Sequence, residues 1–342
     1  MLDAERLIYD LVSIASPSTE EKAAVEHLVS WMSANGYDHT YMDYAGNAVG
    51  IIGNGTREIV LLGHIDTFGG FPPVHMQDRR LYGRGSVDAK GALCTFAAGA
   101  VQANLPDDVR VVVIGAVEEE AASSKGARYA ATQFQPELCI IGEPSNWDRI
   151  TLGYKGRLLI EWTWRGGLAH SAGEALSAPE HAIAYWEHVR AYVDQFNHGI
   201  ESVFGRLDVT LQAINSGQDG AYGWSSMTIG FRLPPGADPQ QIAADLANEN
   251  TRAYGCEKAV VSDKNNPLSR AFRGAIRVQG GTPRFVYKTG TADMNVVAPI
   301  WNCPIVAYGP GDSALDHTPD EHLDLDEYLQ AIDVLADTLS RL

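Results

Sequence analysis

The sequence predicts an α/β fold in which helices flank a central, mostly parallel sheet and a smaller α+β domain is inserted. Apolar runs at Ile59–Leu62, Val109–Val117 and Glu137–Ile141 are typical of strands buried on both faces. Segments with helical periodicity alternate with these runs. From about residue 157 the strands become half-apolar, and the first pattern returns near residue 265. We therefore expect a catalytic domain of residues 1–156 and 265–342, and an inserted domain of residues 157–264.

Length and composition narrow the class of protein. A chain of 342 residues is long enough for two domains, and 45% hydrophobic residues is ordinary for a globular protein. The net charge of -17 argues against nucleic acid or an anionic membrane as the partner. No apolar run approaches the roughly 20 residues of a membrane span. The four cysteines are scattered without a Cys-x-x-Cys pair, which favours reduced thiols and a cytoplasmic protein.

The first half of the chain alternates helices and strands. Ser18-Thr19-Glu20-Glu21 resembles a capping box, and the apolar residues after it recur at helical spacing up to Gly36. The Ala- and Gly-rich segment Ala89–Ala103 predicts a tightly packed helix, and Ser123–Thr132 predicts another. Besides the three buried strands, two more are expected at Tyr37–Asp43 and Asn47–Gly53.

The inserted domain and the closing segment complete the prediction. In the insertion, helices are expected at Ala178–Phe196 and Asp238–Ala253, with a mobile loop at Asn215–Gly223. Strands are expected there at Leu158–Trp164, Arg206–Ile214, Ser226–Leu233 and Lys258–Val261. After it we expect helices at Ser269–Gln279 and Leu325–Leu342, and strands at Pro283–Tyr287 and Pro304–Tyr308.

Polar groups follow the apolar strands where each one ends. His64 and Asp66 lie on the same side of an extended chain, so Asp66 can orient His64. Similar strand-end or turn positions hold Asp88, Glu118–Glu120, Glu143 and His317. Ligand sites in open α/β sheets lie at the carboxyl ends of the strands.

Two histidines and three carboxylates can hold two divalent ions with one carboxylate shared, and a further carboxylate can act as general base. For the glutamate run the alternative is a solvated acidic loop, and for His317 it is a surface histidine.

Five motifs occur in the order of a known family. They are Gly63-His64-Ile65-Asp66-Thr67, Gly83–Gly91, the glutamate run, Gly142-Glu143-Pro144 and Asp316-His317-Thr318-Pro319. They resemble the two-zinc amidohydrolases that include carboxypeptidase G, succinyl-diaminopimelate desuccinylase and acetylornithine deacetylase. The resemblance spans nearly the whole chain. It implies a zinc-peptidase-like catalytic domain, a lid and dimerisation domain at 157–264, and a homodimer.

The resemblance also implies roles for the site residues. One metal ion would be held by His64, Asp88 and Glu143, and the other by Asp88, Glu120 and His317, with zinc expected and cobalt as the alternative. Asp66 would orient His64, and Glu119 would be the general base. A one-residue shift of the alignment would make Glu118 the base. The implied reaction is attack of a metal-bound hydroxide on an amide carbonyl.

Further residues resemble substrate contacts of the family. His170, in Gly167-Leu168-Ala169-His170-Ser171, resembles a histidine that relatives lend to the partner subunit's site, where it stabilises an oxyanion. Its alternative role is that of a polar residue at a strand end. Arg232 resembles the arginine that binds a substrate carboxylate, although Trp224–Met227 replaces the family's usual upstream Asn-x-x-Pro.

A narrower resemblance concerns the substrate. Gly153–Arg157, Lys288–Asn295 and the glutamate run resemble the branch that releases lysine or ornithine from an amino-group carrier protein. Asp293 and Asn295 would then contact the leaving amino acid. The alternatives are a free N-acetyl-lysine or N-acetyl-ornithine deacetylase, and a non-catalytic binding homologue. Because the branch's carrier is acidic, a negative enzyme needs a local basic patch. The candidates are Arg79, Arg80, Arg84, Lys155 and Arg157.

Overall fold

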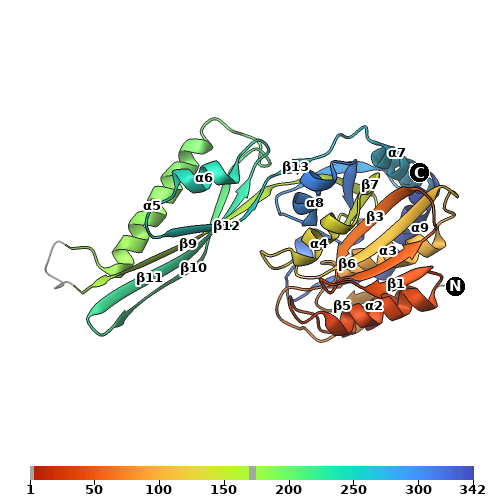
Figure 1. Cartoon of the computed structure of the whole chain (residues 1–342), viewed down its shortest axis with the longest axis horizontal. Coiled ribbons are helices and arrows are strands. Elements are labelled where there is room, and N and C mark those ends of the chain that lie inside the picture. Colours follow the sequence, from red (N-terminus) through yellow and green to blue (C-terminus); the bar gives the residue numbers. More distant parts are fainter. Residues whose placement is uncertain (1–3, 169–174) are drawn as a thin grey trace. The chain divides into compact units, whose positions relative to one another are not determined.

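The computed structural model describes residues 4–168 and 175–342, which form the expected mixed α/β fold (Figure 1). They divide into two compact units. The first comprises the chain up to Gly153 together with Ser262–Tyr287 and Ala292–Leu342. The second comprises Tyr154–Val261 with Lys288–Thr291. Among the described residues, no helix combines the length and apolar character that crossing a membrane requires.

The first unit is built on a large sheet whose central strands are parallel. Its strand order is β1 (His39–Met42), β2 (Ala48–Ile52), β6 (Val109–Ala116), β3 (Arg57–His64), β7 (Leu138–Gly142), β15 (Ile305–Tyr308) and β8 (Arg149–Tyr154), and β14 (Arg284–Lys288) also pairs with β8. Strands β6, β3, β7 and β15 run parallel, whereas β1, β2 and β8 pair antiparallel with their neighbours. The predicted mostly parallel sheet is therefore confirmed.

Helices bury both faces of this sheet. One layer consists of α1 (Ala4–Ser13), α2 (Lys22–Ala34), α3 (Lys90–Gln102), α7 (Pro267–Val278) and α9 (Leu325–Ser340), packed on alternate strand residues such as Ile59 and Leu61. The intervening residues Val60 and Leu62 point the other way and are equally buried. Helices α4 (Lys125–Gln133) and α8 (Asp293–Trp301) pack on each other and on β6 and β15.

A small second sheet and one turn of 3₁₀ helix complete the first unit. Strands β4 (His75–Gln77), β5 (Arg80–Tyr82) and β16 (His322–Asp324) form a separate antiparallel sheet, and η1 (Ser313–Leu315) is one turn of 3₁₀ helix. None of these elements was predicted, and neither were β8 and α8. A proline inside α8, Pro299, masks its helical pattern in the sequence.

The second unit is a four-stranded antiparallel sheet covered by helices. Its order is β10 (Asp208–Asp219), β11 (Tyr222–Leu233), β9 (Gly156–Gly167) and β12 (Thr251–Glu257); β13 (Val260–Val261) follows β12 in the chain. Helices α5 (Ala178–Phe196) and α6 (Pro239–Asp245) pack on it through a separate apolar core. β10 is an edge strand whose residues are mostly exposed.

Three local predictions are wrong for identifiable reasons. The helix expected over 238–253 ends at Asp245, because the Asn248 side chain accepts from Asn250 N and starts a turn into β12. The mobile loop expected at 215–223 instead belongs to the long β10–β11 hairpin. The capping box before α2 does not form, because Ser18 binds Asp66 rather than the helix end.

Candidate metal centre

The candidate ligands come from the ends of neighbouring parallel strands, which lie side by side in Figure 1. His64 is the last residue of β3, Glu143 directly follows β7, and Glu118–Glu120 follow β6 by one residue. Asp88 precedes α3 in a glycine-containing turn, and His317 follows η1. Parallel strands point their carboxyl ends to one edge of the sheet, so these separate segments meet there.

Five of the predicted side chains form two clusters that share Asp88. Ligand atoms of His64, Asp88 and Glu143 lie within 4.8 Å of one another, and so do those of Asp88, Glu120 and His317. The Nε2 atom of His64 is 3.3 Å from Asp88 Oδ1, whereas His317 Nε2 is 3.1 Å from Asp88 Oδ2. Each oxygen of Asp88 therefore faces a different histidine, which is the arrangement of a bridging carboxylate.

Asp66, which was predicted to orient His64, lies beside its ring. His64 Nδ1 lies 3.0 Å from the Asp66 carbonyl oxygen and 3.4 Å from its carboxylate. Asp66 can hold a proton on Nδ1, and Nε2 is then available to bind a cation in place of its contact with Asp88. This is the tautomer that a metal-binding histidine needs.

Asp66 also holds the glutamate turn. Its two oxygens accept from Glu119 N and Glu120 N, both at 3.0 Å, and Ser18 Oγ donates to it at 2.7 Å. Glu118 adopts a left-handed conformation with φ of 59°. Glu21 Oε1 accepts from Glu118 N at 3.1 Å. The conformation of the turn is thus stabilised by the side chains of Asp66 and Glu21 rather than by its own backbone preference.

The segment before α2 supports the same strand end. Ser16 Oγ donates to the Ile65 carbonyl at 2.8 Å, and Thr67 N donates to the Ser16 carbonyl at 2.9 Å. With Ser18 and Glu21, these contacts join the amino-terminal part of the chain to the residues around His64. No signal in the sequence indicates this role, because Ser18 and Glu21 match a capping box equally well.

Burial and mutual repulsion shift the titration of these groups. Burial, with neighbouring Asp293 and Glu120 charges, raises the pKa of Glu119 well above its usual value. Burial and the Glu119 charge do the same for the pKa of Glu143. Hydrogen bonds to the Asp88 and Glu120 carboxylates raise the pKa of His317 to about 10. Burial opposes a charge on Asp88, but hydrogen bonds with His317 and His64 lower the pKa of that carboxyl.

This donor set fits divalent cations. Imidazole nitrogens and carboxylate oxygens are zinc-type ligands, and each cluster supplies three protein groups and leaves room for a further ligand. Cations would also offset the repulsion among the buried carboxylates. The arrangement is unlike the solvated acidic loop that the glutamate run alone would suggest.

The two candidates for the general base differ in their partners. The Glu118 carboxylate accepts from Ser123 Oγ at 2.7 Å and lies 3.4 Å from Lys125 Nζ. Glu119 instead feels the charges of His64, Asp293, Glu120 and Asp66. The carboxyl that shares the environment of the two clusters is therefore Glu119.

The residues predicted to contact substrate belong to different units of the structure. Asp293 is buried at the start of α8 in the first unit, and Asn295 Oδ1 accepts from Ala292 N at 3.0 Å, so Asn295 caps that helix. Arg232, in the second unit, donates to Thr291 Oγ1 at 2.7 Å. His170 lies outside the described residues.

An aromatic contact at His317 has no sequence signal. The ring of Phe68 stacks on the imidazole of His317 with centroids 4.4 Å apart and planes 10° apart. Phe68 is nevertheless half exposed. An exposed phenylalanine in a Gly- and Pro-rich loop is inconspicuous in the sequence, and only the folded chain brings it to this histidine.

The predicted basic patch is wrong for two of its members. Arg84 is buried against Glu321, and Lys155 is buried with its Nζ 2.6 Å from Asp208 Oδ2. Arg79 is engaged by Glu5 and Asp326. Burial thus removes Arg84 and Lys155 from the surface that an acidic partner would meet, and carboxylates offset the charge of the exposed Arg79.

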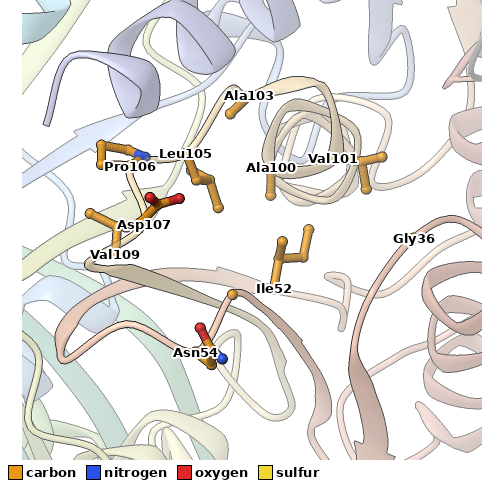
Figure 2. Close-up of a pocket in the computed structure, with 11 residues that line it drawn as sticks. Gly36, Ile52, Asn54, Ala100, Val101, Ala103, Leu105, Pro106, Asp107 and Val109 are labelled. Atoms are coloured by element: carbon orange, nitrogen blue, oxygen red, sulfur yellow. The ribbon is translucent and has the colours of Figure 1, made fainter.

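Figure 2 shows a concavity that lies away from the two clusters. It encloses about 400 Å³ near the amino end of β6, opposite the strand end that leads to Glu118–Glu120. Its lining is mostly apolar, with Asp107 as its one charged residue. Without converging polar groups it offers no chemistry comparable with that of the metal centre.

Comparisons with known proteins place the chain in a family. Residues 60–341 match the model of peptidase family M20/M25/M40. A Deinococcus radiodurans protein named [LysW]-lysine hydrolase is 49% identical, covering 99% of this chain and 97% of its own. A Saccharolobus islandicus [LysW]-lysine/[LysW]-ornithine hydrolase is 28% identical, covering 95% and 91%.

Solved structures share the fold at low identity. The M20 family metallo-carboxypeptidase Sso-CP2 from Sulfolobus solfataricus superimposes with a TM-score of 0.78 at 17% identity, covering 99% of both chains. The Bacillus subtilis YXEP protein, described as a dinuclear metal-binding peptidase of the M20 family, gives a TM-score of 0.66 at 14% identity, covering 99% and 96%. The family match and the 49% identical relative together show that this chain belongs to peptidase family M20/M25/M40.

Proposed function

We propose that this chain is a metal-dependent amide hydrolase that releases lysine from an amino-group carrier protein, with ornithine as the second candidate leaving group. The observation that carries the proposal is the 49% identity, over 99% of the chain, with a protein named [LysW]-lysine hydrolase. The paired clusters that share Asp88 support the same reaction class, because amide hydrolysis suits a two-metal site. Ornithine is the second candidate because the name of the Saccharolobus relative includes it beside lysine.

We propose that the two clusters hold two divalent cations, zinc first and cobalt as the alternative. When bound, such ions polarise an amide carbonyl and lower the pKa of a water molecule. His64 would present Nε2 because Asp66 holds its Nδ1 proton. Asp88 would use one oxygen toward each cluster, and Glu143, Glu120 and His317 would complete the two sets.

Glu119 is the proposed general base. Burial raises the pKa of Glu119, and a raised pKa makes its carboxylate a stronger base. It would take a proton from water and pass it to the leaving nitrogen. The Glu119 backbone is held by Asp66, so the carboxyl is positioned by the same residue that orients His64.

Roles in the second unit are also proposed. Its long exposed edge strand β10 suits a contact with a second copy, because unpaired edges invite strand addition. This supports residues 157–264 as a lid and dimerisation domain, with His170 and Arg232 contributing to substrate binding. Four free cysteines, two of them buried, suit a reducing cytoplasm.

The substrate is tested by competition. Purified chain, loaded with zinc, is offered equal amounts of lysyl-carrier and ornithyl-carrier conjugates, with N-acetyl-lysine in a parallel reaction. We expect lysine release to dominate. Faster turnover of N-acetyl-lysine than of either conjugate would contradict the carrier proposal and favour a free deacetylase.

The base is tested by paired substitutions. Glu119→Gln keeps the shape of the side chain and removes its basicity, so kcat is expected to fall by about 10²–10⁴-fold with metal content unchanged. Glu118→Gln is the matched control, because the Glu118 carboxylate already accepts from Ser123 Oγ. Undiminished turnover in Glu119→Gln would refute the assignment.

A further inference from the structure

A buried carboxylate outside the two clusters binds the backbone of the shared ligand. Glu321 is 1% exposed, and its Oε1 accepts from Val87 N at 3.0 Å and from Asp88 N at 3.1 Å. Its Oε2 accepts from Arg84 Nη1 at 2.6 Å. Both oxygens are therefore used, and two of the three bonds hold the turn that presents Asp88.

The partner of this carboxylate reaches the other loop of the centre. Arg84 is 7% exposed, and its guanidinium donates to the carbonyls of His317 and Thr318, both at 3.3 Å. It also donates to the Gly70 carbonyl at 3.3 Å, in the loop that carries Phe68. One ion pair thus connects three loops around the candidate metal centre.

These loops need an external restraint. His64 and Glu143 are fixed by the ends of β3 and β7. His317 instead adopts φ of 61°, a backbone conformation that is unfavourable for residues other than glycine. It follows only a single turn of 3₁₀ helix. Asp88 lies in an irregular turn between β5 and α3. The residues that hold His317 and Asp88 in place are thus not those of a regular element.

We propose that Arg84 and Glu321 form a positioning pair that sets the distance between Asp88 and His317. The pair touches no substrate, and it acts on the second cluster through the backbone of both ligands. The first cluster depends on it only through Asp88. This inference rests on the proposed function in one respect, namely that the clusters bind metal ions.

The test measures metal binding rather than turnover alone. Glu321→Gln keeps the shape of the side chain but has one acceptor oxygen, so it cannot accept from both the backbone N–H groups and Arg84. Arg84→Lys keeps the positive charge but lacks the planar guanidinium. Zinc and cobalt affinities are measured by competition with a chromophoric chelator, and stoichiometry by elemental analysis. For both variants we expect the ion of the second cluster to lose about 10–100-fold in affinity, which is the usual effect of mutating the outer partners of metal ligands. The affinity for the ion of the first cluster should change less.

Two further readouts separate positioning from a general loss of stability. The visible absorption of the cobalt-loaded protein should change in both variants, because it reports ligand geometry. The rise in melting temperature on adding zinc should be smaller than in the wild type. Arg79→Lys is the matched control, since its ion pairs with Glu5 and Asp326 are exposed and lie away from the ligands.

The outcomes are distinct. Variants that melt earlier when metal-free, yet bind both ions with wild-type affinity and spectrum, would overturn the positioning role. If Glu321→Gln does not fold, Arg84→Lys alone decides the matter by the same criteria. A wild-type protein that binds fewer than two ions would instead overturn the proposed function.

Discussion

Replacing Asp66 with asparagine should loosen the glutamate turn by a calculable amount. Asp66 is 0% exposed and uses separate oxygens to accept from Glu119 N and Glu120 N. Asparagine offers one acceptor oxygen, so one of these buried N–H groups loses its partner, at about 1–3 kcal/mol. The other bond changes from charged to neutral, which costs about 1 kcal/mol more. The expected total is about 2–4 kcal/mol.

The assay is hydrogen exchange followed by mass spectrometry on the peptide spanning residues 117–124, in metal-free protein. A cost of about 2–4 kcal/mol corresponds to a roughly 30- to 1,000-fold faster exchange of the two amides. Asp324→Asn is the control, because Asp324 accepts from Asp326 N and Glu327 N with a single oxygen, which asparagine retains. Exchange in Asp66→Asn within threefold of the wild type would refute the reasoning.

Three more predictions concern other features. Removing metal with a chelator should lower the melting temperature reversibly, because the buried carboxylates then repel one another; equal melting with and without zinc would count against the centre. Gly142→Ala should destabilise the chain by about 1–3 kcal/mol in thermal unfolding, since its Cβ would lie 2.9 Å from Gly63 Cα and the Phe96 ring, whereas Gly69→Ala meets no atom within 4 Å and should be neutral. Burial raises the pKa of Cys303 to about 11, so in a Cys256→Ser background its alkylation should accelerate about 90-fold from pH 8 to pH 10, against about fourfold for an ordinary thiol.

The parts of the fold with strong periodicity were predictable from sequence. Ile59–Leu62 and Val109–Val117 are continuous apolar runs, and such runs belong to strands buried on both faces. The helix at Pro239 was overextended, because the side-chain turn at Asn248 outweighs the helical pattern that continues beyond it. The missed α8 contains Pro299, which breaks its pattern locally while tertiary packing on β15 retains the helix.

The candidate site was predictable only where chemistry shows in the residue type. His64, Asp88 and His317 are recognisable because few other residues bind metals, and their motifs occur in a familiar order. Glu321 and Ser18 have ordinary alternatives as a loop acid and a helix cap, and their roles arise from long-range hydrogen bonds. Arg84 was wrongly assigned to the basic patch for the same reason, since its charge says nothing about its buried partner.

The contacts of residues 16–21 have a practical consequence. Ser16, Ser18 and Glu21 reach Ile65, Asp66 and Glu118 without belonging to either cluster. A protease that nicks the short connection between α1 and α2 would therefore weaken the support of His64 and of the glutamate turn while sparing every ligand. If a preparation has low activity, its intact mass should be checked before the low activity is ascribed to missing zinc.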